Sequence, residues 1–217
     1  MKKSINANFY PVLINLSKFP CLVVGGGNVA LRKVLSLLEF GAKVTVISPV
    51  ISKALKELHY QRKINLIKKV YSEKFIKDFK IIFSATDNPD TNNKIRYDCT
   101  KNGILLNAAD NPPLCDFILP ANVKRGNLTI SISSQGKAPF YTKKIKELID
   151  IYISPSYEQI LNLAGIFRKE ILSNRKNTLS KNNAFKKFTE TDWESILKMS
   201  GNNSAKKYLK RILKEIN

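Results

Sequence analysis

A short apolar run that ends in three glycines constrains the fold of this chain more than any other feature. Cys21-Leu22-Val23-Val24 is typical of a buried parallel strand, and the turn Gly25-Gly26-Gly27 follows it at once. Apolar residues then recur at helical spacing until Gly41, and residues 43–47 have the pattern of a second strand. These segments predict one βαβ unit, which begins a parallel sheet.

Strand and helix patterns continue to about residue 107. Residues 64–70, 80–85 and 104–107 are strand-like, and residues 90–102 are predicted to form a helix. Strands that alternate with helices imply a Rossmann-like, doubly wound parallel sheet of the α/β class. Such a sheet binds its ligand at the carboxyl ends of its strands.

The pattern changes after Asn111-Pro112-Pro113, because two prolines break a helix or a central strand. Two extended runs, 117–123 and 128–133, are joined through Lys124-Arg125-Gly126-Asn127, which predicts a hairpin. A helix is expected from Ala138-Pro139 to about residue 151.

The last third of the chain has a helical pattern. An apolar stripe is formed by Ile160, Leu163, Ala164, Phe167 and Ile171, and a final helical stretch covers 193–213. Residues 173–183, rich in Asn and Lys, are predicted to separate these helices. We therefore expect a nucleotide-binding Rossmann domain, a small α+β segment and a helical C-terminal domain, at residues 1–113, 114–153 and 154–217.

The glycine turn has the spacing of a dinucleotide fingerprint, Gly25-x-Gly27-x-x-Ala30, between a strand and a helix. Gly25 permits the tight turn, Gly27 lets a pyrophosphate approach the backbone, and Ala30 lets the helix pack closely on the strand. The helix amino end offers N–H groups and its positive dipole to the phosphates. The predicted cofactor site contains Gly25, Gly26, Gly27, Asn28, Val29 and Ala30. A glycine turn without a ligand is the alternative.

Polar residues follow the second and fourth predicted strands. The acidic residue that usually binds the ribose, about 20 residues after the glycines, is missing. The second strand ends in Ile47-Ser48-Pro49, which leaves Ser48 as a cofactor contact and does not decide between NAD and NADP. Thr86 and Asp87 follow the fourth strand, where they are expected to bond the nucleotide ribose or its neighbourhood. A helix cap explains Asp87 as well.

Asn107-Ala108-Ala109-Asp110 follows the next strand at the same edge. Asn107 is expected to contact the cofactor, and Asp110 is the carboxylate best placed to meet a substrate that lies against a nicotinamide. A carboxylate within hydrogen-bond reach of a proton can act as a general base. A turn residue in Asp-Asn-Pro-Pro is the competing interpretation.

The composition narrows the functional class. The net charge of the 217-residue chain is +20, which attracts anions, although a Lys-rich composition explains it equally well. The charge is spread along the chain without aromatic-basic interleaving, so no nucleic-acid partner is expected. No run is long enough to cross a bilayer and no signal peptide is apparent, which predicts a cytoplasmic protein without a membrane partner. The spacing of Cys21, Cys99 and Cys115 and the single His59 predict no metal site.

Several stretches, in this order along residues 8 to 150, together resemble the precorrin-2 dehydrogenase / sirohydrochlorin ferrochelatase family. This family includes the amino-terminal module of multifunctional siroheme synthases. The matching stretches are Tyr10-Pro11-Val12, Leu22-Val23-Val24-Gly25-Gly26-Gly27-Asn28-Val29-Ala30, Ala85-Thr86-Asp87, Asn107-x-x-Asp110, Phe117-Ile118-Leu119-Pro120-Ala121 and Ile132-Ser133-Ser134-Gln135-Gly136-Lys137-Ala138-Pro139. Beyond about residue 155 the resemblance fades.

The resemblance implies an NAD-dependent oxidation of precorrin-2 to sirohydrochlorin, with Asp110 as the catalytic residue. It also implies a homodimer whose second domain interlocks between subunits. Ser134 matches a serine near the tetrapyrrole pocket of the family. The resemblance also implies NAD as the cofactor, because family members likewise end the second strand without the ribose acid and still use NAD.

The basic charge then has a use, because precorrin-2 carries many carboxylates. Lys124, Arg125 and Lys137 lie in segments expected to line its pocket, although a solvated basic face explains each one as well. Two alternatives stay open: an enzyme that also inserts ferrous iron, and a nucleotide-sensing or nucleic-acid-binding regulator.

Overall fold

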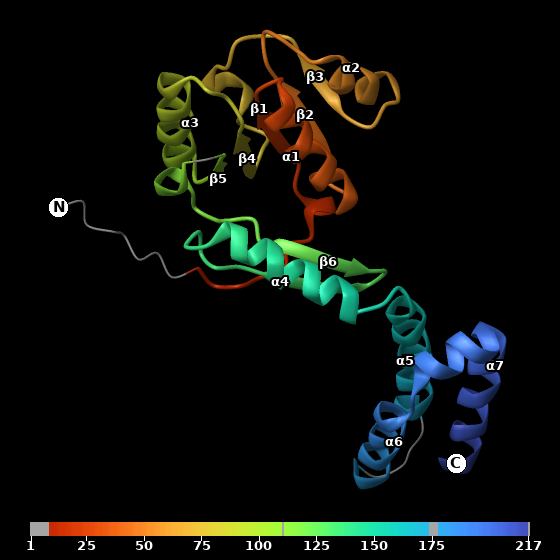
Figure 1. Ribbon diagram of the computed structural model, residues 1–217. Helices are drawn as coiled ribbons and strands as arrows, with labels where there is room; N and C mark the ends of the chain where they lie inside the picture. Colours follow the sequence, from red (N-terminus) through yellow and green to blue (C-terminus); the bar gives the residue numbers. More distant parts are fainter. Residues whose placement is uncertain (1–8, 110, 174–177, 217) are drawn as a thin grey trace. The chain divides into compact units, whose positions relative to one another are not determined.

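The structure is a computed structural model that describes residues 9–109, 111–173 and 178–216. The chain divides into two compact units, unit 1 (Met1–Leu119) and unit 2 (Pro120–Asn217), and each is described by itself. Figure 1 shows both along the course of the chain.

Unit 1 is built on one five-stranded parallel sheet. The strand order is β3-β2-β1-β4-β5. The chain thus adds β2 and β3 on one side of β1, and then β4 and β5 on the other side, with a switch point between β1 and β4. The predicted Rossmann-like sheet is confirmed, and its switch point lies where such sheets bind ligands. The strands are β1 (Cys21–Val24), β2 (Val44–Ile47), β3 (Asn65–Ile67), β4 (Ile81–Ser84) and β5 (Leu105–Ala108).

Helices cover both faces of this sheet (Figure 1). On one face, α1 (Asn28–Glu39) and α2 (Lys53–Tyr60) pack against alternate strand residues such as Val23. On the other face, α3 (Pro89–Asn102) packs against the alternate set, including Leu22. The central strand is therefore apolar at every position, which explains the continuous run in the sequence. Short 3-10 turns lie at η1 (Leu16–Lys18), η2 (Glu73–Phe75) and η3 (Pro112–Leu114).

Unit 2 begins with the predicted hairpin, in which β6 (Ala121–Arg125) pairs antiparallel with β7 (Leu128–Ile132). The first run was expected to start at residue 117, and the strand starts later. Phe117 instead packs edge-to-face on Phe83 of unit 1, with ring centroids 5.6 Å apart. The helix α4 (Pro139–Tyr152) follows the hairpin and contacts both strands.

Three further helices, α5 (Ser156–Ser173), α6 (Thr178–Glu190) and α7 (Trp193–Ile216), share one apolar core. The prediction that residues 173–183 lack helix is wrong, because α6 begins at Thr178. Its Ala184 and Phe188 are buried, so tertiary packing overrides the weak local propensity of Asn and Lys. The backbone of α7 is interrupted at Gly201, whose φ is 71°.

The division between the units falls after Leu119, whereas the sequence placed a domain boundary at residue 113. Residues 115–117 hydrogen-bond to β5, which ties this segment to unit 1.

Candidate nucleotide site at the carboxyl edge of the sheet

The glycine turn is compressed between the ends of three strands. Gly25 has a φ of +129°, and a Cβ at this position would lie 2.2 Å from the carbonyl oxygen of Ala85. Its N–H donates to Ile47 O at 2.9 Å. A side chain therefore fits neither the backbone conformation nor the space.

Gly26 is required for a reason that the motif does not reveal. A Cβ there would lie 1.9 Å from the carbonyl oxygen of Val50, in the loop between β2 and α2. The Gly26 carbonyl also accepts a hydrogen bond from Ser52 N at 2.9 Å. This loop thus lies directly on the glycine turn.

Gly27 differs, because a Cβ there would meet no atom within 4 Å. It precedes α1, and no side chain caps this end of the helix. Ala30, by contrast, is fully buried in the core, as expected for close packing of helix on strand. An open position at Gly27 and a helix start without a side-chain cap are the features that a site for an anionic group such as a pyrophosphate requires.

Two serines lie beside this turn. Ser48 is buried and donates its hydroxyl hydrogen to Val50 O at 2.7 Å, so it shapes the loop and keeps its lone pairs for an incoming donor. Ser52 Oγ is buried without a hydrogen-bond partner among the described residues. No motif in the sequence singles out Ser52. A buried hydroxyl without a partner beside the turn fits a site that is completed by a polar ligand.

Thr86 and Asp87 follow β4 at the same edge. Thr86 Oγ1 accepts from Asn88 N at 3.2 Å, and Thr86 O accepts from Asn92 Nδ2 at 3.0 Å. The cap of α3 is Asn88, whose side chain accepts from Thr91 N, so the alternative that Asp87 caps this helix is wrong. Asp87 is exposed and has no hydrogen bond within the described part of the chain, which leaves its carboxylate accessible.

Asn107 at the end of β5 is committed to internal hydrogen bonds. It is 5% exposed, its Nδ2 donates to Phe117 O at 2.9 Å, and its Oδ1 accepts from Lys33 Nζ at 3.3 Å. The neighbouring Cys115 Sγ accepts from Ala108 N at 3.2 Å. Burial raises the pKa of this thiol, against the opposing effects of the Ala108 N–H and the Lys33 ammonium, so it stays neutral at physiological pH.

Asp110 lies outside the described residues. On either side of it, Ala109 N donates to Ser84 O at 2.8 Å, and Asn111 N donates to Ala108 O at 3.4 Å. The connection that contains the predicted catalytic residue is therefore anchored to β4 and β5.

In unit 2, Arg125 is used to stabilise the carboxyl end of α4. Its Nε donates to Ile153 O at 2.8 Å, and its Nη2 donates to both the carbonyl and the carboxylate of Asp150 at 3.0 Å. Its Nη1 donates to Lys124 O at 3.0 Å. These contacts leave the guanidinium little capacity for a substrate carboxylate.

Ser134 is similarly engaged at the start of α4. Its Oγ accepts from Ala138 N and from Thr142 Oγ1, each at 3.0 Å. Lys137, in the same turn, is exposed. The turn before α4 thus presents the exposed ammonium of Lys137 beside Ser134, whose hydroxyl serves the fold.

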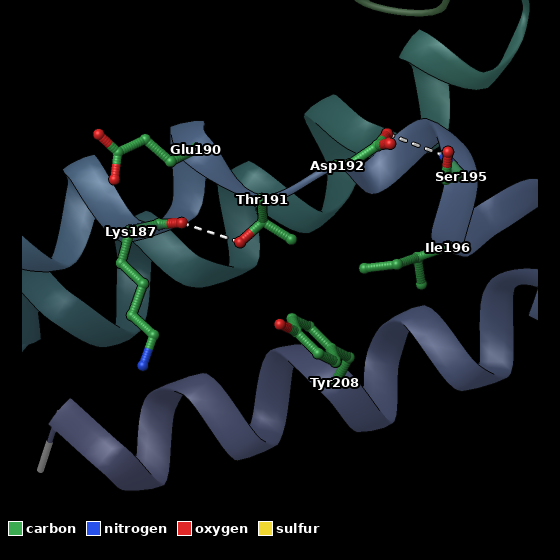
Figure 2. A pocket seen from close by; sticks show the side chains of 7 residues that line it. All are labelled: Lys187, Glu190, Thr191, Asp192, Ser195, Ile196 and Tyr208. Carbon is green, nitrogen blue, oxygen red and sulfur yellow. Dashed lines mark hydrogen bonds between the residues drawn. The ribbon is translucent and has the colours of Figure 1, made fainter.

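A shallow hollow between α6 and α7 contains none of the predicted site residues (Figure 2). Its polar atoms serve the turn between the helices: Thr191 Oγ1 donates to Lys187 O, and Asp192 Oδ1 accepts from Ser195 N. The bonds to Ser195 lower the pKa of Asp192. We assign these residues a structural role.

Two features are absent from the part of the chain that the structure describes. No three His, Cys, Asp or Glu side chains come together as metal ligands there. None of the helices in the described ranges combines the length and the hydrophobicity needed to cross a membrane.

Comparisons with known proteins agree with this geometry. The profile of a family described as "Putative NAD(P)-binding" matches residues 12–121. The siroheme synthase of Psychrobacter sp. (strain PRwf-1) is 37% identical over 166 residues, which are 76% of this chain and 34% of that protein. The siroheme synthase of Saccharophagus degradans is 32% identical over 190 residues, 88% of this chain and 40% of that protein. This chain thus spans about a third of the length of such relatives.

A solved structure is similar over nearly the whole chain. It is SirC, a precorrin-2 dehydrogenase, with a TM-score of 0.75 and 26% sequence identity. The alignment covers 94% of this chain and 100% of SirC. The likeness therefore extends past the parallel sheet of unit 1 into unit 2.

Proposed function

Because this chain belongs to the NAD(P)-binding family whose profile spans residues 12–121, we propose that it is an NAD-dependent precorrin-2 dehydrogenase. The observation that carries the proposal is the uncapped start of α1 at Gly27, where a Cβ would meet no atom within 4 Å. Its likeness to SirC, a precorrin-2 dehydrogenase, supports the choice of substrate.

The residues of unit 1 would bind and orient the dinucleotide. The N–H groups of Asn28 and Val29 and the α1 dipole would hold the pyrophosphate, and Gly27 would let it approach, while the buried Ala30 packs α1 on the strand. Ser48 and Ser52 would provide hydroxyls beside the glycine turn, and Thr86 and Asp87 would lie near the ribose. NAD, when bound, supplies the acceptor for a hydride.

The oxidation removes one hydride and one proton from precorrin-2. We propose that the Asp110 carboxylate accepts the proton as general base, while bound NAD would take the hydride. This role rests on the match of Asp110 to the family motif. Asn107 would act at this edge by fixing the backbone that follows β5, since its amide already bonds Phe117 O and Lys33.

A homodimer is proposed because α4 leaves a large apolar surface uncovered. Phe140, Tyr141, Ile151 and Tyr152 are 78%, 59%, 75% and 77% exposed. Exposed aromatic and aliphatic side chains on one short helix favour a partner surface. Light scattering at micromolar concentration is expected to give the mass of two chains, and a monomeric mass would contradict the proposal. We place the dimer in the cytoplasm, where NAD is available.

Two assays test the proposed function. Calorimetry with NAD and with NADP is expected to show tighter binding of NAD; tighter NADP binding, or no binding of either, would overturn the cofactor assignment. Absorption spectra of the chain with precorrin-2 and NAD are expected to change to those of sirohydrochlorin. A second spectrum with ferrous iron as substrate decides whether the chain also acts as a ferrochelatase.

A further inference from the structure

Lys33 connects the nucleotide helix to the end of β5. It lies on α1, and its Nζ donates to Asn107 Oδ1 at 3.3 Å, across 74 residues of sequence. Burial raises the pKa of the nearby Cys115 thiol, and the Lys33 ammonium opposes that rise. The preceding Arg32 is exposed to solvent, so adjacent cations on one helix face different surroundings.

The Asn107 amide can adopt one orientation in this arrangement. Its Nδ2 donates to Phe117 O at 2.9 Å while its Oδ1 faces the ammonium. A flipped amide would bring two donors together at Lys33 and two acceptors together at Phe117. Because Asn107 is 5% exposed, water does not readily replace these partners. Lys33 therefore fixes the amide that holds Phe117.

Asn107 lies near the end of β5, and Phe117 lies in the connection between β5 and β6. The same connection is held at a second point, where Asp116 Oδ2 accepts from Leu106 N at 2.9 Å and Asp116 Oδ1 accepts from Arg96 at 2.8 Å. That second point joins the connection to β5 and α3. The bond from Lys33 joins it to α1, whose amino end carries the glycine turn.

We propose that Lys33 is a positioning residue for the oxidation, which acts through Asn107 to set the connection after β5 relative to the nucleotide helix. The inference rests on the proposed function, because it assumes that hydride transfer takes place at this edge. Lys33 is not required to touch the cofactor or the substrate in this role. A side chain that links the two sides of the reaction site affects the geometry of transfer more than the affinity for NAD.

The test compares Lys33→Met with the matched control Arg32→Met, which removes the same charge from the neighbouring position. Turnover of precorrin-2 is expected to fall by about 10- to 100-fold in Lys33→Met, because small misplacements at a reaction site cost up to about 100-fold. NAD affinity by calorimetry is expected to stay unchanged in both variants. Arg32→Met is expected to keep the parent turnover, and Lys33→Arg to recover part of it.

A double-mutant cycle tests whether the effect passes through Asn107. Asn107→Leu removes the amide, and the double variant with Lys33→Met is expected to be no slower than the worse single variant. Losses that multiply would show that Lys33 acts independently of Asn107, and would overturn the proposal.

Hydrogen exchange gives a readout that does not depend on activity. The amides of Ala109 and Asp116 are expected to exchange faster in Lys33→Met than in the parent, and at the parent rate in Arg32→Met. Unchanged exchange overturns the proposal, as does faster exchange with full turnover. If the parent itself leaves precorrin-2 unchanged, the proposed function fails, and with it the assigned role in oxidation. The exchange rates then report only whether the Lys33–Asn107 hydrogen bond holds the connection after β5.

Discussion

The amino ends of α1 and α4 both follow glycine-containing turns, yet their polar groups are satisfied in different ways. At α1, Gly27 leaves open space and no side chain caps the helix. At α4 no side chain caps the helix either, but the Ser134 hydroxyl accepts hydrogen bonds from the N–H of the cap residue Ala138 and from the Thr142 hydroxyl. We propose that the first end receives a ligand, whereas at the second end the chain supplies a hydrogen-bond acceptor of its own. A polar group in a family motif is therefore a candidate ligand contact only when no other group of the chain already forms a hydrogen bond with it.

The largest effect is expected from Gly27→Asp, which tests the open end of α1. A carboxylate at this position would fill the anion site and repel the pyrophosphate, so NAD binding should fall below detection by calorimetry. Gly27→Ala is the control, because its methyl group meets no atom within 4 Å and should leave folding intact. Normal NAD binding by the Asp variant would place the nucleotide elsewhere.

Asp110→Asn tests the chemistry at the same edge. The amide keeps the size and turn propensity of the residue but cannot accept the proton, so turnover should drop by about 100- to 10,000-fold. Calorimetry should give the parent affinity for NAD. A turnover close to that of the parent would make Asp110 a turn residue, and a collapse of NAD affinity would mean that it shapes the nucleotide site.

Arg125→Met tests unit 2, where a residue predicted to bind substrate instead stabilises the carboxyl end of α4. Loss of the charged hydrogen bonds to Ile153 and Asp150 is expected to lower the free energy of unfolding by about 1.5–3 kcal/mol. Urea denaturation measures this loss. Unchanged stability together with a raised KM for precorrin-2 would assign Arg125 to the substrate after all.

The smallest effect is expected from Ser134→Ala. Removal of the hydroxyl should destabilise the turn before α4 by about 1 kcal/mol, in the range of one lost hydrogen bond. Thr142→Val removes the second donor to the same oxygen, and the two losses should not add, because the groups are in contact. A change in precorrin-2 affinity without a change in thermal stability would contradict the structural role.

Much of unit 1 could be predicted because its determinants are local. The apolar runs and the glycine spacing identified the parallel sheet, the turn and the buried Ala30, and the family resemblance read from the motifs is confirmed by the relatives. The need for glycine at position 26 was not readable, because it depends on where the Val50 carbonyl comes to lie. The partners of Asn107 and Arg125 are likewise set by distant segments, so the sequence located these side chains without showing how they are used.

The boundaries in the rest of the chain depend on tertiary packing. Phe117 has the composition of a strand residue but packs on Phe83 of the sheet, which delays the hairpin. Phe188 stacks between Phe167 and Trp193 and so recruits an Asn- and Lys-rich segment into α6. Local propensity is a weak guide where a few aromatic contacts decide the structure.

We propose that this chain passes a hydride from precorrin-2 to NAD at the carboxyl edge of the sheet. The most direct test follows NADH formation and precorrin-2 loss together under anaerobic conditions, for the parent chain and for Gly27→Asp. We predict one NADH for each precorrin-2 consumed by the parent, since the oxidation removes one hydride, and no NADH from the variant. Loss of precorrin-2 without NADH, or equal NADH formation by the variant, would contradict the account.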